Sequence, residues 1–338
     1  MFRSRRRAIA IALLMVLPLV LAACSATGGK KAAEAAANGG TGVAAGHANT
    51  KNFTVAMITH ASPGDTFWDI IRSGATAAAA KDNITLKYSS DPDPTKQAQL
   101  IDDAINSKVD GIAVTDPNPG ALCPTIQKAK AAGIPVVMFN AGYSNYQSCG
   151  GMEYFGQDEK VAGVAAGKRL AAAGKKNVLC VLQAQGQAQL EARCAGVKEG
   201  LGSEGTMSKL YVNGVDNSAV LSSMSAELTR NKSVDAVITL GAQFALIAIQ
   251  AMGQAHSTAK LYTFDTSAAE IAKIKSGQVQ WAVDQQPYLQ GYESVDSLWL
   301  YLTNANVIGG GQVVLTGPSF VDASNVNQVA QYAQRGTR

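Results

Sequence analysis

The sequence lacks the short motifs that most enzymes and metal proteins carry. It contains no nucleophile elbow, no HExxH pair, no glycine-rich phosphate loop and no cysteine spacing typical of zinc. These absences argue against an enzyme, and they predict neither a cofactor nor a metal site. No helix-turn-helix precedes residue 53, which argues against a DNA-binding repressor.

The chain beyond its N-terminal leader also lacks an excess of either charge. The full sequence has 29 Lys and Arg and 25 Asp and Glu, but the leader contains four of the arginines and no acidic residue. The remaining chain therefore carries 25 basic and 25 acidic residues. A net charge near zero argues against nucleic acid as a partner, because binding phosphates needs a basic surface.

Residues 1–23 have the pattern of an export signal. Four arginines lead into an apolar run, Ala8 to Val20, that is too short for a stable membrane span. The run ends in Leu21-Ala22-Ala23-Cys24, which resembles the bacterial lipobox. We therefore expect Cys24 to carry a lipid that holds the exported protein at the outer face of the cytoplasmic membrane. An ordinary secretory signal is the alternative, and the export route, Sec or twin-arginine, stays open.

Residues 24–52 predict a flexible tether, because they are mostly Ala, Gly, Ser, Thr and Asn with little to bury. The body that follows has nearly 290 residues, which is long enough for two domains of ordinary size.

Besides Cys24 there are four cysteines: Cys123, Cys149, Cys180 and Cys194. An exported chain lies in an oxidising environment in which disulfides persist. Three connectivities are open to four cysteines. We prefer Cys123–Cys149 and Cys180–Cys194, because each pair then lies inside one predicted domain, and four buried free thiols are the alternative.

The segment 53–75 predicts a strand, a polar turn and a helix. An apolar run at 53–58 suits a buried strand, and Pro63 and Gly64 break regular structure after it. Apolar residues then recur at helical spacing from Phe67 onward. Thr66 with Asp69 three residues later predicts the N-cap of this helix.

Parallel sheets bind ligands at the carboxyl ends of their strands. Four residues that follow the first strand are therefore candidates for binding a small molecule: His60, Asp65, Phe67 and Trp68. Trp68 lies off the apolar stripe of Phe67, so we expect it to face the ligand.

Strands and helices alternate through the rest of the chain, which predicts parallel sheets with helices on both faces. We expect strands at 84–89, 111–115, 134–139, 177–183, 208–212, 234–239, 260–264, 279–284 and near 312–316. We expect helices at 95–107, 120–132, 158–173, 188–201, 218–230, 243–254, 268–276, 288–304 and near 325–334.

The two halves of the chain share a pattern at a fixed offset of 125 residues. Residues 109–115 match 234–240 in pattern, and Phe139-Asn140 matches Phe264-Asp265 at the same offset. Two similar α/β domains that face each other would place Asn140 and Asp265 on opposite walls of one cleft.

Several segments in one order resemble a known family. They are Asp65-Thr66-Phe67-Trp68, Ser90-Asp91-Pro92-Asp93-Pro94, 109–117, 132–137, Phe155-Gly156-Gln157-Asp158, Glu191-Ala192-Arg193, Phe264-Asp265 and Asp284-Gln285-Gln286-Pro287-Tyr288. The chain resembles the type I periplasmic solute-binding proteins of bacterial ABC importers, in the ribose-binding branch for sugars and polyols, over residues 53 to about 325.

The resemblance implies the fold and the arrangement of domains. It implies two similar doubly wound parallel-sheet α/β lobes joined by a three-stranded hinge. Lobe one would comprise 53–153 plus 287–316, and lobe two 154–286 plus 317–338. It also implies a monomer.

A sugar site needs charged or amide groups for the hydroxyls and aromatic rings for the C–H face. The resemblance supports Asp65, Phe67 and Trp68 as one polar residue and two aromatics. It supports five further polar residues, namely Asp116, Asn140, Arg193, Asp265 and Gln285. Asn217, in the loop after the strand at 208–212, is a further candidate from its position.

The sequence departs from the family at two places. Ala141 stands where the family has an arginine, and Gly241-Ala242 stands where it has a polar pair. Both changes remove hydroxyl partners and enlarge the pocket. Ribose is therefore expected no more than a different pentose, a hexose, inositol or a linear polyol.

The leading hypothesis is an exported lipoprotein that captures a sugar or polyol between its lobes and delivers it to an ABC permease. A ligand-sensing receptor component with the same fold is the alternative. Two further alternatives are a surface glycosidase with Asp65 and Asp265 as its carboxylate pair and a binding protein for a non-sugar ligand, such as a nucleoside or signalling molecule.

Overall fold

The computed structural model of the chain describes residues 48–338. The predicted export signal, the lipid anchor at Cys24 and most of the predicted tether lie outside this range. Within it, no helix is both long enough and apolar enough to cross a membrane.

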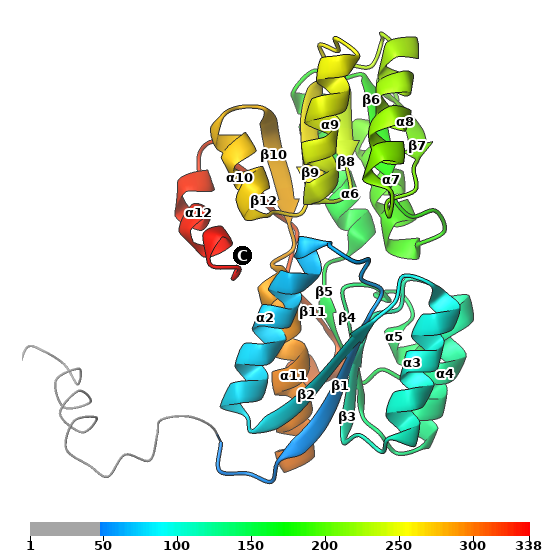
Figure 1. The fold of residues 1–338 in the computed structure, drawn as a ribbon, viewed down its shortest axis with the longest axis vertical. Helices are drawn as coiled ribbons and strands as arrows, with labels where there is room; N and C mark the ends of the chain where they lie inside the picture. The colour runs from blue at the N-terminus through cyan, green and yellow to red at the C-terminus, as the bar shows by residue number, and fades with distance from the viewer. Residues whose placement is uncertain (1–47) are drawn as a thin grey trace, which may run out of the picture. The chain divides into compact units, whose positions relative to one another are not determined.

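Two six-stranded sheets form the framework (Figure 1). The first has the order β11 (Val313–Leu315), β5 (Glu153–Gly156), β4 (Val136–Phe139), β3 (Gly111–Val114), β1 (Phe53–Thr59) and β2 (Ile84–Ser90). The second has the order β12 (Ser319–Asp322), β10 (Val279–Asp284), β9 (Lys260–Phe264), β8 (Ala236–Thr239), β6 (Asn177–Leu182) and β7 (Thr206–Tyr211). All neighbouring strands pair in parallel except β10 and β12, which are antiparallel.

The chain passes between the sheets three times, after β5, after β10 and between β11 and β12. The predicted fold class, two doubly wound lobes joined by three connections, is therefore confirmed. The exact limits of the lobes stay a prediction, and strand pairing bears on one of them. The predicted first stretch of lobe one ends at residue 153, whereas β5 pairs with β4 and β11, so the first sheet continues to Gly156.

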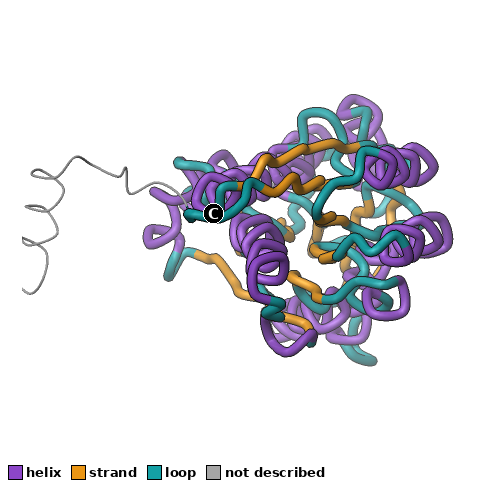
Figure 2. Tube along the Cα trace, turned by 90° about the horizontal axis from the view of Figure 1, so that it is seen from below, coloured by secondary structure: helices purple, strands orange, loops and turns teal. Residues whose placement is uncertain are grey.

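Helices cover both faces of each sheet, and Figure 2 shows them on either side of the strands. The first sheet carries α2 (Thr66–Lys81), α3 (Pro94–Asn106), α4 (Pro119–Ala131), the short α5 (Tyr146–Cys149) and α11 (Pro287–Asn304). The second carries α6 (Glu159–Ala172), α7 (Ala188–Leu201), α8 (Asn217–Arg230), α9 (Ala242–Gln254), α10 (Ala268–Lys275) and α12 (Val326–Gln334). Each lobe thus buries two apolar clusters, one on each face of its sheet.

Every strand and helix that the sequence predicted is present, and the predicted ranges from residue 84 onward have ends shifted by three residues or fewer. The first helix, α2, continues to Lys81, beyond the segment 53–75 in which it was predicted. The prediction missed β5, β12, α5 and the 3₁₀ turn Ile308–Gly311. β5 is buried along its whole length and begins with Glu153, so it shows neither polar alternation nor a long apolar run. The predicted N-cap of α2 was wrong: Asp65 caps the helix by accepting from the Phe67 N–H at 3.1 Å.

The repeat at offset 125 extends to backbone detail. Asn140 and Asp265 each follow the fourth strand of their sheet, and both have a left-handed φ, 61° and 66°. The N–H of Asn140 donates to Phe155 O at 2.9 Å, and the N–H of Asp265 donates to Val283 O at 2.7 Å. Asn and Asp tolerate this conformation better than most residues. The same turn therefore presents one polar side chain at the end of each sheet.

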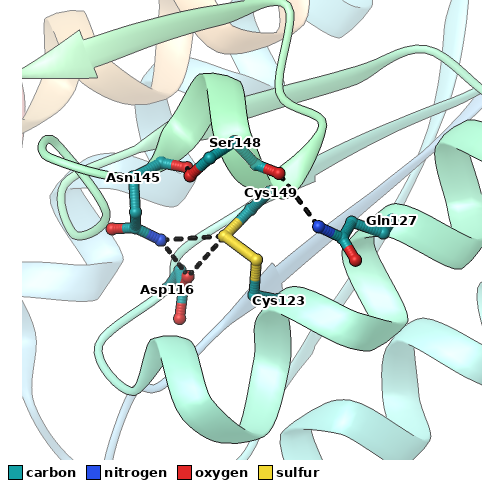
Figure 3. Close-up of a disulfide and its surroundings, with 6 residues drawn as sticks. All are labelled: Asp116, Cys123, Gln127, Asn145, Ser148 and Cys149. Carbon is teal, nitrogen blue, oxygen red and sulfur yellow. Dashed lines mark hydrogen bonds between the residues drawn. A yellow bond between two sulfur atoms is a disulfide. The ribbon is translucent and has the colours of Figure 1, made fainter.

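Both preferred disulfides are present: Cys123 pairs with Cys149 and Cys180 with Cys194. The first joins α4 to α5, as Figure 3 shows, and the second joins β6 to α7. Each cross-link therefore lies within one lobe.

Glycines set the distance between the two helices that lie side by side on the first sheet, α2 and α11. A Cβ at Gly291 would lie 1.9 Å from the backbone oxygen of Ile71, and a Cβ at Gly74 would lie 2.0 Å from that of Tyr288. The backbones of the two helices touch at these points, so no side chain fits between them.

We predict that Gly291→Ala lowers the free energy of unfolding by about 3 kcal/mol, the upper end of overpacking costs, because α11 must move away from α2. Denaturant titration measures this change. The control is Gly253→Ala in α9, where a Cβ would meet nothing within 4 Å in the described part of the chain. It should be neutral or stabilise by up to about 1 kcal/mol. Equal effects of the two substitutions would contradict the packing argument.

Candidate functional site

A cavity of about 500 Å³ lies between the carboxyl ends of the strands of the two sheets. Eight of the ten predicted binding residues line it: His60, Asp65, Phe67, Trp68, Asn140, Arg193, Asp265 and Gln285. The strand-end rule thus brings together residues that are more than 200 positions apart in the sequence. Asp116 and Asn217 lie outside the lining.

Asp116 is buried beside the first disulfide instead (Figure 3). Asn145 donates from Nδ2 to Asp116 Oδ2 at 2.6 Å, and the Cys149 sulfur lies 3.8 Å from that oxygen. A disulfide sulfur has no proton to donate, so the sulfur contact is packing. Burial raises the pKa of Asp116 to about 6, although the hydrogen bond from Asn145 acts in the opposite direction. Asp116 therefore anchors the loop at Asn145 and packs against the first disulfide.

Asn217 is exposed at the first turn of α8. Asp216 caps this helix by accepting from the N–H groups of Ser218 and Ala219. The residue of the same loop that lines the cavity is Asn213. The helix begins at Asn217, before the predicted residue 218, so Asn217 belongs to the helix and lies outside the lining of the cavity.

Three rings form an aromatic corner on the lobe-one wall. His60 and Trp68 meet edge to face with centroids 4.7 Å apart, and Phe67 and Trp68 do so at 5.3 Å. Trp68 is buried among the core residues of α2, whereas Phe67 is partly exposed. The prediction that Trp68 lies off the apolar stripe of the helix was therefore wrong, since Trp68 lies on the buried face of α2. Both rings nevertheless line the cavity.

Asp65 adds a carboxylate beside these rings. Burial raises the pKa of Asp65 to about 6, although the hydrogen bond from the Phe67 N–H acts to lower it. One oxygen serves as the helix cap, as described above. The carboxylate is thus held at a defined place on the wall of the cavity.

The lobe-two wall is organised around a buried guanidinium. Arg193 on α7 donates from Nε to Glu159 Oε2 at 2.6 Å and from Nη2 to Glu159 Oε1 at 2.9 Å. Its Nη1 donates to Leu240 O at 2.9 Å and lies 3.5 Å from Asp265 Oδ2. Burial alone would lower the pKa of Arg193, but Glu159 and Asp265 hold that pKa above its ordinary value. The arginine therefore stays charged.

Asp265 joins this group to the hinge. Gln285 donates from Nε2 to Asp265 Oδ1 at 2.6 Å, and Asn140 donates from Nδ2 to Gln285 Oε1 at 3.2 Å. Burial raises the pKa of Asp265 to about 7, although Arg193 and the hydrogen bond from Gln285 act in the opposite direction. One hydrogen-bonded chain of side chains therefore runs from the lobe-two wall across the hinge to lobe one.

The same network reaches all three connections between the lobes. Gln285 follows β10, and Gln290 donates from Nε2 to Gln285 Oε1 at 2.9 Å and to Thr316 Oγ1 at 3.1 Å. Thr316 follows β11, and Gln157, which follows β5, donates to Glu159 Oε2 at 2.8 Å. Hydrogen bonds therefore connect the residues that line the cavity to all three hinge connections.

Two hydrogen bonds join the lobes across the cleft. The Ala188 N–H donates to Pro117 O at 3.0 Å. Gln189 Nε2 lies 3.1 Å from His60 Nε2, and His60 Nδ1 lies 2.8 Å from Thr115 Oγ1. If the amide donates to Nε2, the neutral ring carries its proton on Nδ1. Burial and the nearby Arg193 lower the pKa of His60 to about 3, which favours this neutral form.

Sequence reasoning missed several polar residues of the lobe-two wall, among them Gln183, Gln189, Asn213 and Gln243. Gln183 directly follows β6 and Asn213 closely follows β7, so the strand-end rule could have found both. Gln189 and Gln243 lie in the first turns of α7 and α9, and nothing in their sequence context marks them.

The cavity therefore offers carboxylates, amides and a guanidinium beside aromatic rings. This is the chemistry that binds hydroxyl groups and an apolar ring face. Among the described residues, no group of three or more His, Cys, Asp or Glu side chains is placed to hold a metal ion.

Comparison with known proteins gives consistent matches. The family described as periplasmic binding protein domain matches residues 55–306. The chain is 61% identical to a carbohydrate transporter from Acidothermus cellulolyticus whose crystal structure contains myo-inositol. That match covers 85% of this chain and 100% of the other, with a TM-score of 0.84.

Two more distant matches extend the comparison. The chain is 27% identical over 251 residues to the xylose/arabinose-binding protein of Sulfolobus acidocaldarius. That match covers 69% of this chain but only 62% of the relative's length. A glucose-galactose binding protein from Geobacillus stearothermophilus, 20% identical, has a TM-score of 0.73 over 82% of this chain and 99% of the other, which shows the fold alone.

We predict that Glu159→Gln lowers the free energy of unfolding by about 3 kcal/mol, because it leaves the buried Arg193 without its main partner. The control is Glu199→Gln, which removes an ion pair with Lys160 between the same two helices, where both side chains are more than half exposed. It should change the stability by less than about 1 kcal/mol. Urea titration of both variants measures the difference. Similar losses of unfolding free energy in the two variants would show that the buried Arg193–Glu159 pair contributes no more to stability than the exposed pair.

The pKa of His60 predicts a pH dependence. Its ordinary value of 6.5 falls to about 3 in the folded protein, so below pH 6.5 the unfolded chain binds a proton that the folded chain does not. Folding is therefore weakened as the pH falls. Relative to His60→Gln, the wild type should lose about 2 kcal/mol of stability between pH 7.5 and pH 5. Parallel pH profiles of the two proteins in thermal unfolding would contradict a buried neutral His60.

Proposed function

Because the chain belongs to the family of periplasmic binding protein domains, we propose that it captures a sugar or cyclitol in the cleft between its lobes and delivers it to an ABC permease. The protein acts by binding and does not convert its ligand. The two parallel-sheet lobes of this chain suit that role, because their strand ends line one cavity between them.

One observation carries the proposal: the cavity places the Arg193–Asp265–Gln285–Asn140 chain of polar groups and the aromatic corner of Phe67 and Trp68 around one space. A cyclic polyol has hydroxyl groups that both donate and accept, and a C–H face that packs on a ring. The structure at 61% identity contains myo-inositol. Myo-inositol is therefore the first ligand to test, before pentoses, hexoses and linear alditols.

Binding is coupled to closure through the hinge network. The ligand that fits the cavity contacts both lobes, so it has more contacts in the closed state than in the open one. A ligand shifts a conformational equilibrium by its difference in affinity for the two states. Because Gln285 and Asn140 lie on both the cavity and the hinge, the ligand stabilises the same hydrogen bonds that hold the lobes together.

The location of the protein follows from its N-terminus. We propose that the chain is exported, is attached through a lipid on Cys24 to the outer face of the cytoplasmic membrane, and works as a monomer.

A thermal-shift panel of myo-inositol, pentoses, hexoses and alditols tests the function on the chain without its leader and with both disulfides formed. A ligand that binds the folded state raises the melting temperature by mass action. Asp265→Asn and Trp68→Ala should each weaken the best ligand by about 100-fold, as expected for loss of a buried polar or aromatic contact.

The control is Asn217→Ala, which changes an exposed residue outside the cavity and should bind as the wild type does. No shift with any member of the panel would refute the sugar and cyclitol proposal. If Asp265→Asn does not change the affinity for a ligand, that ligand binds outside the cavity that Asp265 lines.

A further inference from the structure

The outer part of the cavity has a rim that the proposed site does not use. Tyr211, Asn213 and Val215, at the end of β7 and in the loop before α8, line the cavity and are all exposed. Tyr211 is 42% exposed and Val215 is 64% exposed, so both leave apolar surface in water at the cleft. Exposed apolar surface beside polar groups in a concave site is a common mark of ligand contact.

The rim is held in place. The Val212 N–H donates to Leu182 O at 3.0 Å, and the Gly214 N–H donates to Gln183 O at 2.9 Å. The Tyr211 hydroxyl lies 3.4 Å from Glu191 Oε2, which also accepts from Lys209 at 2.6 Å. The loop and the ring are therefore preorganised at the end of the second sheet.

The volume of the cavity is larger than one ring needs. It measures about 500 Å³ although the lobes are already joined by the Ala188–Pro117 and Gln189–His60 hydrogen bonds. Cavities for drug-sized ligands range from about 300 to 1,000 Å³. A single pentose, hexose or inositol lies at the small end of that class, so one ring against Trp68 and Asp265 leaves the rim unfilled.

We propose that the rim, namely Tyr211, Asn213 and Val215, is a second subsite that takes a second hydroxylated ring. The ligand class is then a disaccharide or a glycosylated cyclitol, with its first ring in the inner site. The C–H face of the second ring packs on Tyr211 and Val215, and one of its hydroxyls bonds to the side-chain amide of Asn213. This inference rests on the proposed function, because it assumes that the inner site holds a sugar or cyclitol ring.

Titration calorimetry with two probes, myo-inositol and α-galactosyl-myo-inositol, tests the subsite on the mature chain. The galactoside should bind at least as tightly as myo-inositol. Tyr211→Ala should weaken the galactoside by about tenfold, the value of a lost ring contact, and Val215→Ala should weaken it by a smaller factor. Binding of myo-inositol should stay unchanged in both variants.

The control for general damage is Tyr301→Ala on α11, which has a similar exposure of 39% and lies outside the cavity. It should leave both affinities unchanged. If the protein binds myo-inositol but not the galactoside, the second subsite is refuted and the proposed function is retained. The same conclusion follows if Tyr211→Ala weakens the binding of both probes equally. Binding of neither probe would overturn both proposals for this class of ligand.

Discussion

The cleft depends on one buried ion pair, that of Arg193 with Glu159. Removing two charges from water is costly, and the cost is repaid only where the geometry is good and the remaining donors are satisfied. Glu159 accepts from two nitrogens of the guanidinium, and Leu240 O accepts from the third. The guanidinium of Arg193 is therefore fixed in position by hydrogen bonds to Glu159 and Leu240 O. Asp265, Gln285 and Asn140 take their positions from this fixed charge, and through them the hinge is connected to the cavity.

The two lobes reach this arrangement by repeating one local structure. Each sheet has the same strand order, and in each the fourth strand ends in a polar residue with left-handed φ whose N–H bonds to the next strand. The sequences of the two lobes differ in most other respects. What is repeated is the turn that directs a side chain into the cleft, which places Asn140 and Asp265 in the same cavity.

The sequence predicted the fold and most of the inner site because both follow from strand ends. Alternating strand and helix signals locate the sheets, and a parallel sheet collects its strand ends at one edge. The rule failed where neighbours decide the direction of a side chain. Asp116 also follows a strand, but Asn145 and the first disulfide hold it away from the cavity. Gln189 could not be found, because its role arises from the approach of a second lobe, which no local pattern encodes.

The placement of the disulfides has a mechanical consequence. The two bridges span 26 and 14 residues of sequence, and within residues 48–338 neither connects one lobe to the other. Each bridge reduces the freedom of the unfolded chain, and neither cross-links one lobe to the other. The disulfides therefore stabilise each lobe separately. The angle between the lobes is left to the hydrogen bonds of the hinge and the cleft, which can break and re-form without any change of a covalent bond.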